Sequence, residues 1–169
     1  MGASLRFDYS YVINRMDIIS ISVNDFEIPG IIPEEKKSIT NRSSGIGFKL
    51  FQDTKDHRSY PTRGWFNSVS LGLNGEWLGG QNNYQTLKYE FKHYIPWGEH
   101  GVVAARISGI NSYGDIPFWA LPSMGSNLDL RGYERGKYRG RHLVAIQAEY
   151  RWGFWKKRWG FATFAGAGR

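Results

Sequence analysis

The chain has 169 residues, no cysteine, 21 glycines, 16% aromatic residues and a formal net charge of +7 at pH 7. The absence of cysteine excludes disulfide scaffolding and cysteine-ligated metal, and no apolar run approaches the roughly 18 residues of a membrane-spanning helix. The aromatic and glycine content favours β-sheet over disorder, and the positive charge permits nucleic acid, anionic lipid or lipopolysaccharide as partners without selecting one.

Seven segments alternate apolar and polar residues with the period of two that a β-strand requires. In chain order we predict strands over residues 4–12, extending toward 23, and over 45–52, 65–77, 84–95, 101–110, 142–152 and about 158–168. The intervening residues 24–43, 53–64, 78–83, 96–100, 111–141 and 153–157 are predicted loops and turns. The sequence therefore predicts an all-β antiparallel meander forming one domain over residues 1–169.

The predicted connections alternate between short and long, so the long ones are expected at one end of the meander and the short ones at the other. On this arrangement five tryptophans gather near the short-turn end: Trp65, Trp97, Trp152, Trp155 and Trp159. Indole places an apolar ring in hydrocarbon and its N–H among lipid headgroups. This gathering predicts an aromatic belt at a membrane interface.

The polar face of the predicted strands is charged as well as hydrophilic. Its charged residues are Arg6, Asp8, Lys49, Lys88, Glu90, Lys92, Arg106, Glu149 and Arg151. Strands of about 9 to 11 residues with an apolar outside and a polar inside are typical of outer-membrane barrels. The same alternation also fits a soluble sandwich or a lipocalin-like barrel with its apolar face turned inward, and the pattern alone leaves both open.

One stretch, residues 128–150, combines a basic loop with a cleanly alternating strand. The loop half carries Arg131, Arg135, Lys137, Arg139 and Arg141, interspersed with glycines and tyrosines. The segment LRGYERGKYRGRHLVAIQAEYR resembles the VRGF/LRGY loop-and-strand motif of the bacterial surface-antigen barrels of the BamA/TamA type. Three further segments match that family in the same order: DTKDHRSYPTRG, YGDIPF and FATFAGAG.

This resemblance implies a location in the bacterial outer membrane and a role in inserting or transporting proteins there. The family barrel has sixteen strands, and its Arg-Gly-aromatic loop joins the eleventh to the twelfth, so the chain would supply about the seventh to the thirteenth. We therefore expect part of a transmembrane barrel, with the long extracellular loop 111–141 folding into the lumen. The partners it implies are outer-membrane lipid, lipopolysaccharide and unfolded outer-membrane or secreted client proteins.

The resemblance also implies that the lumen-loop motif Leu130, Arg131, Gly132 and Tyr133 is anchored inside the barrel, because the family's loop arginine pairs with inward acids. The acid of the family's FxDxG strand falls at Gly166 here, and the acid of its YRD falls at Gly140. We therefore expect Arg131 to pair with Glu149 or with an acid beyond residue 169, and less readily with Glu90. A guanidinium suits a carboxylate partner, and we expect Gly132 to let the backbone pass close to the barrel wall. The alternative is a solvated basic loop.

No enzyme, metal site or cofactor is predicted. The four histidines lack metal-ligand spacing, and no G-x-S-x-G motif occurs. The acidic turn containing Asp53 and Asp56 fits turn capping better than cation binding. Two alternative functions stay open: an outer-membrane pore or scaffold barrel without insertase activity, and a soluble basic β-sheet that binds nucleic acid. Nucleic acid is the less expected partner, because base stacking requires aromatic and basic side chains on the same face.

Overall fold

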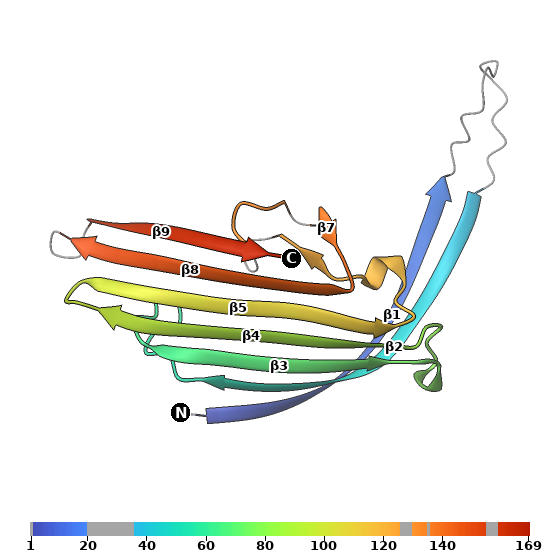
Figure 1. Cartoon of the computed structure of the whole chain (residues 1–169). Helices are drawn as coiled ribbons and strands as arrows, with labels where there is room; N and C mark the ends of the chain where they lie inside the picture. The colour runs from blue at the N-terminus through green and yellow to red at the C-terminus, as the bar shows by residue number, and fades with distance from the viewer. Residues whose placement is uncertain (1, 20–35, 126–129, 135, 155–158) are drawn as a thin grey trace, which may run out of the picture.

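The computed structural model describes residues 2–19, 36–125, 130–134, 136–154 and 159–169. Over these ranges the chain forms one seven-stranded antiparallel sheet in the order β1-β2-β3-β4-β5-β8-β9 (Figure 1). The strands are β1 (Gly2–Ile19), β2 (Lys36–Asp53), β3 (Gly64–Asn74), β4 (Tyr84–Trp97), β5 (Gly101–Gly114), β8 (His142–Phe154) and β9 (Trp159–Gly168). Consecutive strands of the sheet are neighbours, so the predicted antiparallel meander is confirmed.

The two faces of the sheet differ as the alternation predicts, which β8 illustrates. Leu143, Ala145 and Gln147 are buried, whereas Val144 and Ile146 between them are exposed, Ile146 by 55%. We call the first face the inner face and the second the outer face. Other large apolar side chains are exposed on the outer face: Phe48, Leu50, Val69, Leu71, Phe91 and Ile107. An exposed apolar face opposite a polar one is the arrangement of a barrel wall in lipid.

Several strands are longer than the alternation predicts. Residues 36–43, predicted as loop, belong to β2, where Lys36 pairs with Ile19 of β1. Likewise 111–114 belong to β5, and β4 continues to Trp97. The third strand is shorter than predicted, because it ends at Asn74 and a 3-10 turn, η1 (Glu76–Leu78), follows. β2 pairs with β3 only from Gly45 onward, so the β1–β2 hairpin extends beyond the rest of the sheet (Figure 1).

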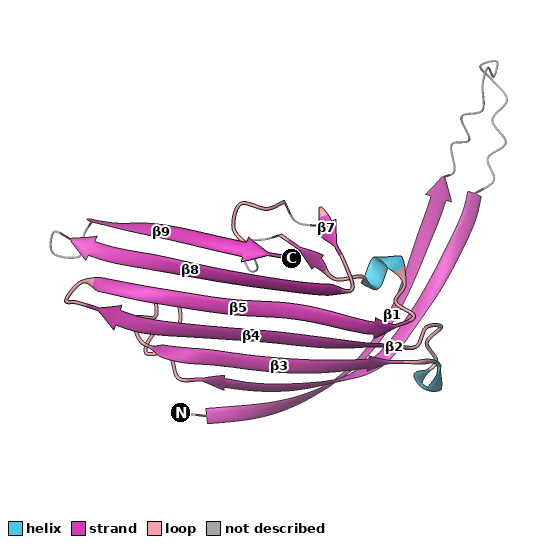
Figure 2. Cartoon of the chain, viewed as in Figure 1, coloured by secondary structure: helices cyan, strands magenta, loops and turns pink. Residues whose placement is uncertain are grey.

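The connections separate into two ends, as predicted. Segments 54–63 and 98–100 join strands at one end, and segments 75–83 and 115–141 join strands at the other. The last of these, which we call the long loop, contains η2 (Phe118–Ala120), β6 (Ser123–Met124) and β7 (Tyr138–Arg139), with β6 and β7 paired (Figure 2). No helix in the described part of the chain is long and apolar enough to cross a membrane.

The long loop lies against the inner face. Residues 120–123 of the loop line a cavity together with Lys49, Ser70 and Lys88 of strands β2 to β4. Further along the loop, Leu130 is 2% exposed and forms a buried apolar cluster with Leu143 and Ala145 of β8. The buried apolar cluster of the described residues thus lies where the loop meets the inner wall.

Candidate functional site on the inner face

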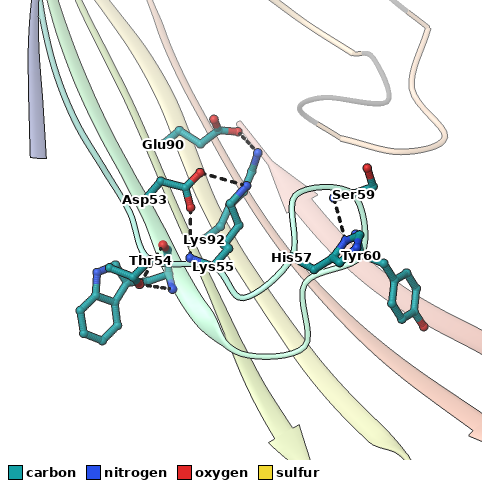
Figure 3. A network of polar contacts seen from close by, with 9 residues as sticks. Asp53, Thr54, Lys55, His57, Ser59, Tyr60, Glu90 and Lys92 are labelled. Carbon is teal, nitrogen blue, oxygen red and sulfur yellow. Dashed lines mark hydrogen bonds and ion pairs between the residues drawn. The ribbon is translucent and has the colours of Figure 1, made fainter. Parts of the chain in front are cut away.

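Two glutamates organise the charges of the inner face, and the first is Glu90 of β4. Its Oε1 lies 2.6 Å from Arg106 Nη2 of β5 and 3.0 Å from Lys92 Nζ. Lys92 also lies over the ring of Phe66, with Nζ 5.3 Å from the ring centre. Figure 3 shows Lys92 beside Glu90. We call Glu90, Lys92 and Arg106 the wall cluster, because all three belong to the sheet.

The second glutamate, Glu149 of β8, joins the sheet to the long loop. Its Oε1 accepts a hydrogen bond from Arg151 Nε at 2.6 Å, and its Oε2 lies 3.1 Å from Arg131 Nη1. The guanidinium of Arg131 also lies over the ring of Phe164 on β9, 5.2 Å from its centre. Phe164 pairs directly with Glu149 across the two strands. We call Glu149, Arg151, Arg131 and Phe164 the loop cluster.

The structure brings together one of the predicted pairs and not the other. Arg131 meets Glu149, whereas Glu90 is occupied by the two cations of the wall cluster. Sequence reasoning missed Phe164, although its place two residues before Gly166 puts it on the same face of β9. The side chains of Arg6 and Asp8, predicted on this face, lie outside those described.

The remaining motif residues have separate roles. Leu130 is buried against β8, while Tyr133 is exposed and stacks edge-on against Tyr138 within the loop, with ring centres 5.6 Å apart. A Cβ added to Gly132 would meet nothing within 4 Å, and its φ is +90°. The expectation that Gly132 allows close approach to the wall is therefore wrong. Glycine is needed there because few other residues adopt this left-handed backbone.

The turn over residues 54–63 joins strands at the end of the sheet opposite the long loop, and it contacts the loop cluster. The Asp56 carboxylate accepts hydrogen bonds from the Thr62 hydroxyl and from the backbone N–H of Thr62 (2.8 Å) and Arg63 (3.2 Å). These bonds, chiefly the one from the Thr62 hydroxyl, hold the pKa of Asp56 well below its ordinary value. His57 Nδ1 accepts the N–H of Ser59 and Tyr60 (Figure 3).

The closed turn places the Tyr60 ring 5.1 Å from the Arg151 guanidinium carbon. Asp53 at the base of the turn accepts the backbone N–H of Lys55 and pairs with its ammonium at 3.4 Å. These contacts are capping interactions. Within the described residues, no group of three or more His, Asp or Glu side chains is arranged to hold a metal ion.

Four of the five tryptophans predicted to form the belt lie at the short-turn end. Trp65 is the second residue of β3, Trp97 ends β4, Trp152 is near the end of β8 and Trp159 begins β9, and all four are exposed. Trp152 also packs edge-on against Phe161, with ring centres 5.6 Å apart. Trp155 lies outside the described residues. The interface role of this group stays a prediction.

An antiparallel sheet with an apolar outer face, a charged inner face and a loop bound inside defines a segment of an outer-membrane β-barrel. The family comparison agrees, because residues 2–169 match the Omp85 superfamily domain. The chain therefore belongs to the Omp85 superfamily, a family of outer-membrane protein assembly and translocation.

The fold is also similar to a solved structure, that of BamA from Haemophilus ducreyi lacking POTRA domains 1-3. The match has a TM-score of 0.76 and 19% sequence identity, and it covers 98% of this chain. The chain spans 38% of the length of that BamA chain. No match was found among curated proteins.

Proposed function

We propose that this chain forms part of a barrel that takes part in inserting or transporting proteins at the bacterial outer membrane, without enzymatic activity of its own. The proposal rests on family membership and on one observation, the 3.1 Å pair between Arg131 of the long loop and Glu149 of the wall. This pair holds the loop inside the barrel through a charge-assisted contact. A loop held at a fixed place in the lumen supports the wall strands while client strands are accommodated.

The test is Arg131→Ala in the full-length protein, expressed in outer membranes depleted of the native copy. Arg139→Ala is the matched control, because Arg139 is also a loop arginine but lies over Phe118 within the loop, 5.2 Å from its ring centre. We expect Arg131→Ala to expose the loop to proteinase K and to slow the assembly of an eight-stranded barrel client at least several-fold. Unchanged assembly in a variant with an exposed loop would overturn the proposed role.

A pore or scaffold barrel without insertase activity is the second candidate function. A cavity of about 300 Å³ beside the long loop, on the inner face, is lined by one acid, Glu90, and by four cations, Lys49, Lys88, Lys92 and Arg106. A basic lumen supports the passage of anions. Anion-selective conductance in a planar bilayer, together with normal client assembly when the protein is depleted, would favour this function over insertion.

The outer face supports lipid and lipopolysaccharide as partners, since its apolar residues are exposed and its tryptophans gather at one end. It disfavours nucleic acid. The exposed apolar side chains Phe91, Ile107 and Ile146 lie on the outer face, whereas Glu90, Arg106 and Glu149 lie on the inner one. A single-strand platform needs free aromatic rings beside cations on one surface, whereas the inner-face rings of Phe66 and Phe164 already lie against Lys92 and Arg131.

A further inference from the structure

We infer that Leu130 is the positioning residue that seats the long loop, and that Gly166 of β9 provides its socket. This inference deepens the proposed function, because it concerns how the same loop is held in the lumen. On this view the loop is held in the lumen by a buried apolar contact in addition to the contacts of Arg131.

The burial of Leu130 is the first observation. It is 2% exposed, although its neighbours Arg131, Gly132 and Tyr133 are all exposed. Its side chain belongs to the buried cluster with Leu143 and Ala145, two inner-face residues of β8. A leucine that is buried this completely against the wall stabilises the docked loop more than a solvated residue of the same loop does.

The second observation is the space at Gly166. A Cβ built on Gly166 would lie 2.9 Å from Leu130 Cδ1 and 3.2 Å from the backbone oxygen of Ile146. Any side chain at this position would displace Leu130 or the wall. Gly166 pairs with Gln147, so it lies on the inner face, two residues after Phe164. The absence of a side chain at 166 is therefore what admits Leu130.

These observations give a physical reason for the absence of an acid at position 166. At the position where the resembled family carries an aspartate, this chain has a glycine that Leu130 covers. Glu149 and Phe164 supply the contacts of the arginine instead, at 3.1 Å and 5.2 Å. The two arrangements exclude one another, because an aspartate side chain and Leu130 would need the same space.

Gly166→Asp in the full-length protein tests the inference, since docking by acids and docking by Leu130 predict opposite results. If pairing with acids alone holds the loop, a restored aspartate strengthens docking and slows cleavage. If Leu130 seats the loop, the aspartate expels it and trypsin cleaves the loop faster on intact cells, by at least about tenfold for a lost buried leucine. Neither Gly166→Asp nor Leu130→Ala alters a trypsin site.

Two further variants and one control complete the test. Leu130→Ala alone should also accelerate cleavage at least about tenfold, and added to Gly166→Asp it should restore part of the protection, because alanine leaves room for the aspartate. Gly72→Asp is the matched control, since Gly72 also lies on a strand beside an inner-face cavity and a Cβ there would meet its nearest atom, Thr86 O, only at 3.8 Å.

Heat-modifiable gel migration reports whether each variant barrel has folded. If Gly166→Asp fails to fold, Leu130→Ala decides the matter alone. Slower or unchanged cleavage in Gly166→Asp, or unchanged cleavage in Leu130→Ala, would overturn the inference. Client assembly is measured separately. If these variants release the loop while client assembly stays intact, the result supports the seating role of Leu130 and overturns the proposed function.

Discussion

The wall cluster and the loop cluster use the same chemistry for different purposes. Each places one inner-face glutamate between two cations, but Glu90 binds both through a single oxygen, whereas Glu149 uses one oxygen for Arg151 and the other for Arg131. Glu90 is satisfied by its own sheet. Glu149 keeps an oxygen for a residue of the long loop. The clusters therefore differ in the origin of their cations: both partners of Glu90 belong to the wall, whereas one partner of Glu149 comes from the long loop.

The register places different residues opposite the two glutamates. Glu90 pairs with Ser108, and Arg106 lies on the same face of β5 two residues away, within reach of the carboxylate. Glu149 pairs with Ala104 on one side and Phe164 on the other. Ser68 and Ser108 opposite Glu90 offer no ring, whereas Phe164 opposite Glu149 offers one on which a guanidinium can stack.

The largest expected effect comes from neutralising the two glutamates separately. Glu149→Gln removes the charge that faces Arg131 and should shift the loop toward release by about 2 kcal/mol, close to thirtyfold. Glu90→Gln should leave loop protection unchanged, because its partners are in the wall. Protease protection of the loop in both full-length variants measures the difference. Equal release in the two variants would show that the clusters are not distinct.

The fold was predictable because lipid imposes a simple pattern. Inside the membrane one face must be apolar, so β3 to β5, β8 and β9 alternate visibly and their order follows. The errors lie where this constraint ends. Residues 36–43 and 111–114 are strands whose sequences, KKSITNRS and NSYG, are largely polar on both faces and so lack the alternation that predicts a strand.

The candidate site was only partly predictable, and the reason is again physical. Arg131 and Glu149 could be paired from the motif and from strand alternation, since both clues reside in single segments. The contribution of Phe164 and the covering of Gly166 by Leu130 depend on where β9 lies relative to the loop. The way in which distant segments pack together cannot be read from the sequence of either segment alone.

A smaller effect should separate the aromatic partners of the two clusters. Phe164→Leu keeps an apolar side chain but removes the ring beneath Arg131, a loss of about 0.5 to 1 kcal/mol, or two- to fivefold in loop protection. Phe66→Leu is the matched change, because Phe66 lies under Lys92 of the wall cluster. Only Phe164→Leu should alter protease protection. An effect of Phe66→Leu of the same size would contradict a specific role for the ring under Arg131.

The smallest effect on the difference between the two clusters is expected from the 54–63 turn, because it contacts the loop cluster directly and the wall cluster only through Phe66. Tyr60 lies over Arg151 of the loop cluster, and Lys55 lies 5.3 Å from the centre of the Phe66 ring that also contacts Lys92. The pKa of Asp56 is lowered from 3.8 by its hydrogen bonds, so folding of the turn favours the carboxylate. Its contribution to stability is therefore complete above about pH 4 and is lost as the pH falls through the lowered folded value.

We accordingly expect hydrogen exchange at the Thr62 and Arg63 amides to be slow and unchanged from pH 7 to about pH 4, once the intrinsic pH dependence is removed, and to accelerate at lower pH. Asp56→Asn should abolish this acid transition, because the side chain no longer titrates. Since the turn contacts both clusters, loosening it should weaken them together and leave the contrast between Glu149 and Glu90 in place. If the transition persisted in Asp56→Asn, another group would have to govern the turn.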